Sequence, residues 1–203
     1  KSIEKKIFTP LGLILKINNK SLQMDIASNY IENFINKRNK KLNLLKIHHD
    51  HKKEGFNILK NNNIDKNKWI VTLHIREPSY RGENKFNSKE NFRTSDPLSY
   101  ISACKEIIKE GGIVFRMGDK RMSKFPEIEG VIDYAHSSFK SEFMDIFLAS
   151  QSRFCIGTAS GFFRIPRYFG VPVLFTNSAS YSPLFSLKKG DIFLPRMIKN
   201  IKK

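Results

Sequence analysis

The pattern of apolar and polar positions changes at about residue 68. Before this point the chain is mostly polar, and one stretch, residues 21–40, places apolar residues at helical spacing, at Leu22, Ile26, Tyr30 and Phe34. The segment 61–68, NNNIDKNK, has the composition of a surface turn or linker. We therefore predict that residues 1–68 form a polar, mostly helical segment that ends in this turn.

After residue 68, strand-like and helix-like patterns alternate. The run 69–75, WIVTLHI, has almost no polar interruption, as a parallel strand buried on both faces requires. Helices are expected at 97–112, at 141–151 and after Gly161. Further strand-like runs lie at 112–118, 130–136, 153–157 and 170–177. This alternation predicts an α/β fold with a doubly wound parallel sheet and flanking helices, a Rossmann-like domain over residues 69–203.

Polar or glycine-rich residues follow each expected strand. In open parallel sheets, ligands bind in the crevice beyond the carboxyl ends of the strands, so these segments are expected to converge on one rim. They are His74–Glu77, Arg116–Asp119, Asp133–His136, Gly157–Gly161 and Thr176–Asn177.

The turn Gly157–Gly161 suits a phosphate or pyrophosphate group. Small residues let the backbone approach a ligand, and the helix that follows offers N–H groups and a partial positive charge. The hydroxyls of Thr158 and Ser160 can add hydrogen bonds. An ordinary strand-to-helix turn capped by Ser160 is the alternative.

Arg76, at the tip of the first strand, is the strongest candidate for binding an anion. A guanidinium grips phosphate with two parallel hydrogen bonds. His74 lies on the same side of the strand and can support the arginine or act on a leaving group, and Glu77 can orient either. The alternative is a structural ion pair of Arg76 with Glu77 or Asp119. Arg116, on the next strand, adds a cation and has Asp119 as its candidate partner.

Two carboxylates, Glu142 and Asp145, lie at the start of the expected helix 141–151. There they stabilise the helix dipole, or they accept a hydrogen bond from a sugar or ribose hydroxyl.

The composition is that of a globular protein with a strong positive charge. The chain has 203 residues, 40% of them hydrophobic, and a formal net charge of +17. No apolar run reaches membrane-spanning length. The chain begins with Lys1 and not with Met, so we expect a piece of a longer protein. Cys104 and Cys155 are expected to be buried free thiols in a reducing compartment.

The charge is compatible with nucleic acid, a membrane surface or an anionic small molecule as partner. Most aromatic residues fall at buried-type positions, which argues against stacking on nucleic-acid bases. In the run GFFRIPRYFG the phenylalanines are expected to pack and Arg164 and Arg167 to face solvent. The tract of His48, His49 and His51 lies beside two lysines and is predicted to be a solvated loop and not a metal site.

Several ordered blocks resemble a family of bacterial glycosyltransferases associated with surface-polysaccharide gene clusters. The blocks are VTLHIREP, GGIVFRMGD, GVIDYAHS, KSEFMDIFLASQSRFCIGTASG, FGVPVLFTN and KKGDIFLPRMI. The resemblance covers residues 69–198. More distantly, the His-x-Arg tip is similar to the arginine motif of fucosyltransferases, and residues 141–172 are similar to heptosyltransferases. The chain lacks the His that follows the phosphate turn of heptosyltransferases.

These families have two Rossmann domains, of which the C-terminal one holds the nucleotide-sugar. The resemblance therefore implies a GT-B half in which a donor diphosphate faces Arg76, Thr158, Ser160 and Gly161. From their places at a strand tip and in the turn, Arg116 and Gly157 are further candidates for binding the diphosphate. It also implies that the segment with Asp133, Tyr134 and His136 flanks the base of the nucleotide. Asp119, Glu142 and Asp145 are further candidate nucleoside or sugar ligands, as carboxylates near the same rim.

The resulting prediction is a glycosyltransferase, or its donor-binding domain, that needs no cofactor or metal. It transfers a sugar from a nucleoside diphosphate to a surface polysaccharide or lipopolysaccharide acceptor. His74, Arg76 and Glu77 are the candidate catalytic residues, and His136 is a further candidate base. The expected location is the cytoplasm, with peripheral association at the inner face of the bacterial membrane, where lipid-linked acceptors reside. Residues 1–68, a missing domain or another subunit would bind the acceptor. The alternatives are a non-catalytic nucleotide-binding subunit and a basic nucleic-acid-binding module.

Overall fold

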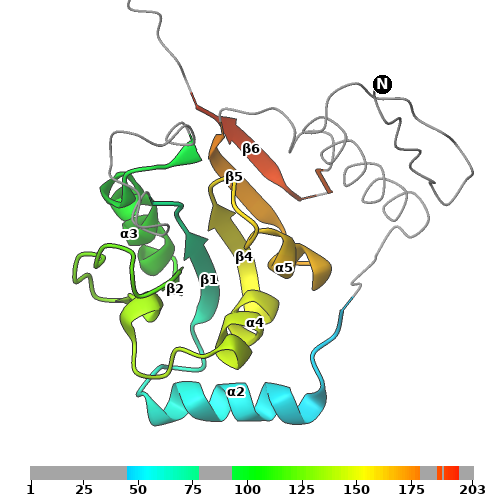
Figure 1. Ribbon diagram of the computed structural model, residues 1–203. Helices are drawn as coiled ribbons and strands as arrows, with labels where there is room; N and C mark the ends of the chain where they lie inside the picture. The colour runs from blue at the N-terminus through cyan, green and yellow to red at the C-terminus, as the bar shows by residue number, and fades with distance from the viewer. Residues whose placement is uncertain (1–44, 78–92, 179–186, 189, 197–203) are drawn as a thin grey trace, which may run out of the picture.

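A computed structural model describes residues 45–77, 93–178, 187, 188 and 190–196 (Figure 1). The helix predicted at residues 21–40 lies outside the described residues. No helix in the described ranges combines the length and the apolar composition that crossing a bilayer requires.

The fold is built on a six-stranded, all-parallel sheet with the strand order β3-β2-β1-β4-β5-β6. The strands are β1 (Trp69–His74), β2 (Gly112–Met117), β3 (Val131–Ile132), β4 (Ser152–Gly157), β5 (Val173–Ser178) and β6 (Ile192–Pro195). The direction of winding reverses between β1 and β4, so a crevice is expected at their carboxyl ends. The predicted doubly wound parallel sheet is confirmed. The edge strand β6, which pairs with β5, was not predicted, because its four residues carry only a short apolar pattern.

Helices cover both faces of the sheet. One face packs on α3 (Ile101–Lys109), which continues from the 3₁₀ turn η3 (Pro97–Tyr100). The other packs on α4 (Glu142–Gln151), α5 (Arg164–Tyr168) and α2 (His49–Asn61) (Figure 1). Side chains alternate along β1 accordingly: Ile70 belongs to the α4 core, whereas Val71 and Leu73 belong to the α3 core.

The predicted helix at 141–151 is confirmed, and its cap explains where it begins. Ser141 accepts a hydrogen bond from the backbone N–H of Met144 at 3.1 Å. The predicted helix at 97–112 begins instead as a 3₁₀ turn, with Asp96 as its cap. Of the two glycines that end the predicted helix, Gly111 lies in a turn and Gly112 is the first residue of β2.

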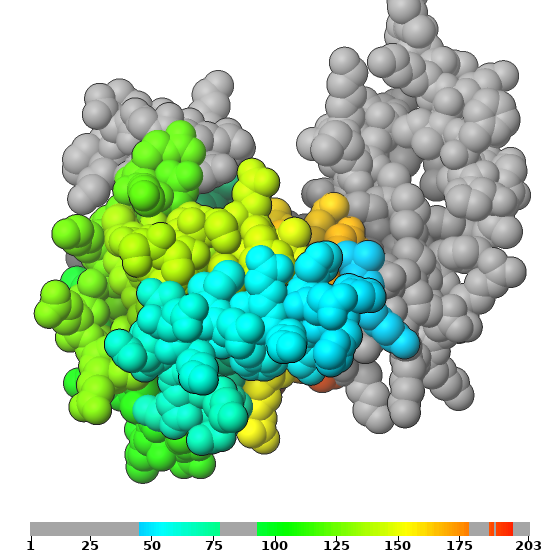
Figure 2. Space-filling model, turned by 90° about the horizontal axis from the view of Figure 1, so that it is seen from below, coloured from blue at the N-terminus to red at the C-terminus, as the bar shows by residue number. Residues whose placement is uncertain are grey.

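The histidine tract, predicted to be a loop, is helical. His48 caps α2, its Nδ1 accepting from Asp50 N at 3.4 Å, and the acidic Asp50 favours the first turn of the helix. α2 then packs on α4 through Gly55, which lies against the ring of Phe147. Figure 2 shows the cyan residues of α2 lying against the yellow-green residues that include α4. The described part of the first 68 residues therefore shares the core of the sheet, while the predicted division at residue 68 stays a prediction.

Candidate functional site

A pocket of about 410 Å³ lies at the carboxyl ends of β1, β2 and β4, where the strand order reverses. Seven residues that the sequence singles out line it: His74, Arg76, Glu77, Asp119, Asp145, Ser160 and Gly161. They come from segments up to 87 positions apart in the chain, His74 and Gly161 being the extremes. Three of the five expected rim segments therefore contribute to one concave site, whereas no residue of Asp133–His136 or Thr176–Asn177 is among the described residues of its lining.

Hydrogen bonds tie the turn after β4 to the tip of β1. The N–H of Thr158 donates to the carbonyl of His74 at 3.1 Å, and the hydroxyl of Thr158 accepts from the N–H of Arg76 at 2.8 Å. Ser160 Oγ lies 3.1 Å from His74 Nδ1. Thr158 is fully buried and uses its hydroxyl within the protein. Its place in the site is therefore to position Arg76, while Ser160 faces the pocket.

The glycines of the turn leave open space. A Cβ atom added to Gly161 would meet nothing within 4 Å, and one added to Gly157 would meet the carbonyl of His74 at 3.7 Å. Packing within the protein does not require a glycine at either position, so the space at Gly161 belongs to the pocket.

The helix after the turn differs from the expectation. α5 has five residues and begins only at Arg164. The backbone N–H groups of Phe162, Arg164 and Ile165 already donate to groups of the turn, namely Ser160 Oγ and the carbonyls of Gly161 and Phe162. These three N–H groups are thus occupied within the protein. They cannot belong to the predicted set of unpaired helix amides that would face a phosphate.

His74 is held as a neutral imidazole. Its ring stacks on Phe162 with centroids 5.1 Å apart. Burial, followed by the positive charges of Arg116 and Arg76, lowers the pKa of His74 from 6.5 to about 4. A neutral ring can exchange a hydrogen bond with Ser160 but adds no positive charge to the pocket near neutral pH.

This lowered pKa predicts an acid-sensitive fold. In the unfolded chain His74 takes up a proton near pH 6.5, whereas the folded protein resists protonation until about pH 4, so the folded state loses stability as pH falls through this window. We expect the free energy of unfolding of wild type to fall more steeply between these pH values than that of His74→Asn. Urea unfolding at several pH values measures this, with the exposed His51→Asn as control. Parallel curves for wild type and His74→Asn would contradict the prediction.

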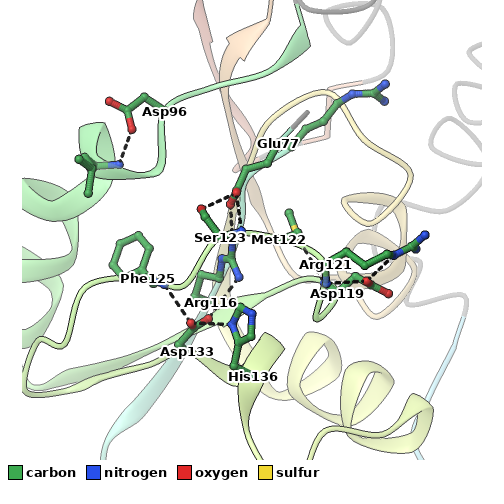
Figure 3. A network of polar contacts seen from close by, with 12 residues as sticks. Glu77, Asp96, Arg116, Asp119, Arg121, Met122, Ser123, Phe125, Asp133 and His136 are labelled. Atoms are coloured by element: carbon green, nitrogen blue, oxygen red, sulfur yellow. Dashed lines mark hydrogen bonds and ion pairs between the residues drawn. The ribbon is translucent and has the colours of Figure 1, made fainter. Parts of the chain in front are cut away.

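Behind one wall of the pocket, a buried network of charges surrounds Arg116 (Figure 3). Its guanidinium donates to Glu77 through Nη2 and to Asp133 Oδ1 through Nη1, the latter at 3.2 Å. The second carboxylate oxygen of Glu77 accepts from the N–H and the hydroxyl of Ser123, at 2.9 and 2.6 Å. Arg116 is fully buried, so its charge serves this network and does not line the pocket.

The predicted pairing of Arg116 with Asp119 is wrong. Asp119 pairs with the exposed Arg121 at 2.7 Å, and the hydrogen bonds from Arg121 lower the pKa of Asp119. Figure 3 shows this pair to one side of the buried network. The alternative pairs of Arg76 with Glu77 or Asp119 are not among the ion pairs of the described residues, since Glu77 goes to Arg116 and Asp119 to Arg121.

The predicted nucleoside ligands Asp133, Tyr134 and His136 are not among the described residues that line the pocket. Asp133 Oδ2 accepts from the N–H of Phe125 at 2.9 Å and lies 2.8 Å from His136 Nδ1. The phenol of Tyr134 exchanges hydrogen bonds with the backbone of Ser141, and burial raises its pKa. These residues brace the segments that carry the pocket wall, and contact with a nucleoside stays a prediction.

The two candidate carboxylates of α4 lie in different surroundings. Glu142 is exposed at the first position of the helix and does not line the pocket, whereas Asp145 does. Asp145 is bonded through both oxygens to Lys140 Nζ, each at 3.0 Å.

The sequence did not single out Lys140, Phe162 and Met122, which also line the pocket, whereas Met117 and Gly118 belong to the expected rim segment Arg116–Asp119. Lys140 comes directly before Ser141, the cap of α4, on the same rim as the strand ends. This position in the sequence could have identified it as a pocket residue. Arg167, expected to face solvent, is buried and pairs with Asp191 next to β6. In the described ranges, no three His, Cys, Asp or Glu side chains gather as a metal-binding group.

Comparisons with known proteins find likeness among solved structures only. No protein-family model matches it, and no curated protein does either. Its structure is similar to a glycosyl transferase of family 9 from Veillonella parvula, with a TM-score of 0.48 and 9% identity, over 74% of this chain and 41% of that one. It is also similar to the E. coli ADP-heptose lipopolysaccharide heptosyltransferase II, with a TM-score of 0.45 and 11% identity, over 78% and 46%. The chain thus spans less than half the length of either protein.

Proposed function

We propose that this chain is the donor-binding part of a glycosyltransferase that uses a nucleoside-diphosphate sugar. The supporting observation is the pocket itself. Arg76 and Ser160 belong to two separate blocks that resemble donor-binding motifs, and both line one cavity at the reversal of the strand order. The product would be a surface polysaccharide or lipopolysaccharide, built on a glycan or lipid-linked acceptor at the inner face of the membrane.

In the proposed reaction, the acceptor hydroxyl attacks the anomeric carbon and the nucleoside diphosphate leaves. Arg76 stabilises the charge that develops on the departing diphosphate, and no metal ion is assigned to this role. Ser160 Oγ and the open space at Gly161 accommodate a phosphate oxygen. Neutral His74 orients Ser160 across the 3.1 Å contact.

The base that deprotonates the acceptor is proposed to lie on the acceptor side. A group with a pKa near 4, as in His74, is a weak base at neutral pH. Glu77 is occupied by Arg116 and Ser123, and His136 does not line the pocket. An acceptor-binding domain or subunit would complete the enzyme.

A non-catalytic nucleotide-binding protein is the second candidate, and the same observation about His74 and Glu77 favours it. It would bind the nucleotide and leave a nucleotide-sugar unchanged. Transfer or hydrolysis of the sugar, measured with the nucleotide-sugar whose nucleotide binds, separates this candidate from the enzyme.

Calorimetric titration of UDP, GDP, ADP and CMP tests the pocket. We expect one of the diphosphates UDP, GDP and ADP to bind wild type more tightly than the monophosphate CMP. Arg76→Ala should weaken this binding by roughly 10- to 100-fold, since hydrogen bonds to charged groups contribute about 1.5–3 kcal/mol. Arg153→Ala is the matched control, because this exposed arginine lies over Trp69, away from the pocket.

Failure of folded wild type to bind any of the four nucleotides would overturn the proposal. Salt-dependent binding to nucleic acid would then support the basic nucleic-acid-binding alternative.

A further inference from the structure

The side chain of Lys140 is placed more firmly than a surface lysine usually is. Its neighbour Ser141 is bonded through its backbone to the phenol of Tyr134 and caps α4 with its hydroxyl. The ammonium group lies 5.3 Å from the centre of the Tyr134 ring, and the side chain is 17% exposed. Lys140 therefore projects a partly desolvated charge toward the pocket from a fixed position.

The charged groups among the described residues that line the pocket differ in their partners. Glu77 and Asp119 each have a cation of their own, Arg116 and Arg121, and neither of these arginines lines the cavity. His74 is neutral near pH 7. Besides these, the described lining residues include the cations Arg76 and Lys140 and the carboxylate of Asp145, which is the partner of Lys140.

Asp145 is a partner that a ligand can displace. An ammonium group has three N–H donors, and two of those of Lys140 go to the oxygens of Asp145. Asp145 is 32% exposed, and partly exposed ion pairs contribute only about 1 kcal/mol or less. A phosphate group that enters the pocket can take the third donor and compete with Asp145 for the other two.

We propose that Lys140 is a donor-binding residue that contacts the diphosphate from the start of α4, and that Asp145 holds it in place when the pocket is empty. This inference rests on the proposed function and assigns two cations, Arg76 and Lys140, to one diphosphate. Two cations favour a nucleoside diphosphate over the corresponding monophosphate. Asp145 is then a competitor of the ligand, in contrast to its predicted role as a ligand of ribose or sugar.

The test compares nucleotide affinities of variants by calorimetry on the 203-residue chain, using whichever of UDP, GDP or ADP binds wild type and its monophosphate. We expect Lys140→Met to weaken binding of the diphosphate about tenfold or more and that of the monophosphate less. Lys140→Arg keeps the charge and should restore most of the affinity. Asp145→Asn frees Lys140 and should tighten binding several-fold.

Lys105→Met, on the exposed side of α3, controls for the loss of one positive charge. If wild type binds a nucleoside diphosphate and Lys140→Met binds it equally well, the inference is overturned while the proposed function stands. Weaker binding by Asp145→Asn would overturn the competitor role and support a direct contact of Asp145 with the ligand. If folded wild type binds no nucleotide, both proposals fail.

Discussion

Replacing Arg116 by methionine should destabilise the protein by about 3–5 kcal/mol, because breaking a buried ion pair leaves its partner charges without compensation. Arg116 is fully buried, and the side chains of Glu77 and Asp133 are 4% and 20% exposed. In Arg116→Met both carboxylates would remain in a poorly solvated site without their cation. Urea unfolding monitored by circular dichroism measures the loss in the free energy of unfolding. A larger loss would be seen as failure of the variant to fold.

Two further variants make this prediction specific. Arg121→Met removes a guanidinium that is 60% exposed and should change the free energy of unfolding by about 1 kcal/mol or less. Arg116→Met combined with Glu77→Gln removes one of the stranded charges and should recover part of the stability. An Arg116→Met protein as stable as wild type would show that the buried network contributes little to the fold.

Replacing Gly55 by leucine should destabilise the protein by about 3 kcal/mol, near the upper end of the cost of overpacking a core. A Cβ atom at Gly55 would come within 2.2 Å of the ring of Phe147, which is fully buried. That ring also meets Phe56 edge-on, with centroids 5.2 Å apart, so it has little room to move. α2 would have to lift off α4.

The matched control is Asn57→Leu, which adds the same side chain to the solvent-facing side of the same helix. Leucine favours helix formation more than asparagine or glycine does, so propensity alone would stabilise both variants slightly. Thermal unfolding of the two proteins therefore separates packing from propensity. Equal melting temperatures would contradict the close contact of α2 with α4.

The fold was predictable where the sequence carries a long pattern. The uninterrupted run at β1 and the cap-to-cap pattern of α4 identify their elements directly. The histidines before Gly55 were misassigned because a short polar helix is stabilised mainly by what it packs on, here Phe147, which lies some 90 positions away in the sequence. β6 was missed because four residues carry too little pattern.

The location of the site was predictable from the sequence, but the ion pairs within it were not. The rule that parallel strand ends converge brought His74, Arg76 and Ser160 together correctly. Choosing ion pairs by nearness in sequence failed at Arg116, whose carboxylates lie 39 and 17 positions away. Sequence spacing cannot resolve such choices, because register between neighbouring strands decides which tips meet.

The central position of β1 has a consequence for how the protein is made. β1 pairs only with β2 and β4, both in parallel, so no local hairpin can form around it. Ser160, which completes the contact with His74, is synthesised 86 residues later. At about 5–20 residues per second, several seconds pass on the ribosome before the two sides of the site can meet. Until then the apolar side chains of β1 lack part of their cover, and apolar surface exposed in this way during synthesis favours aggregation.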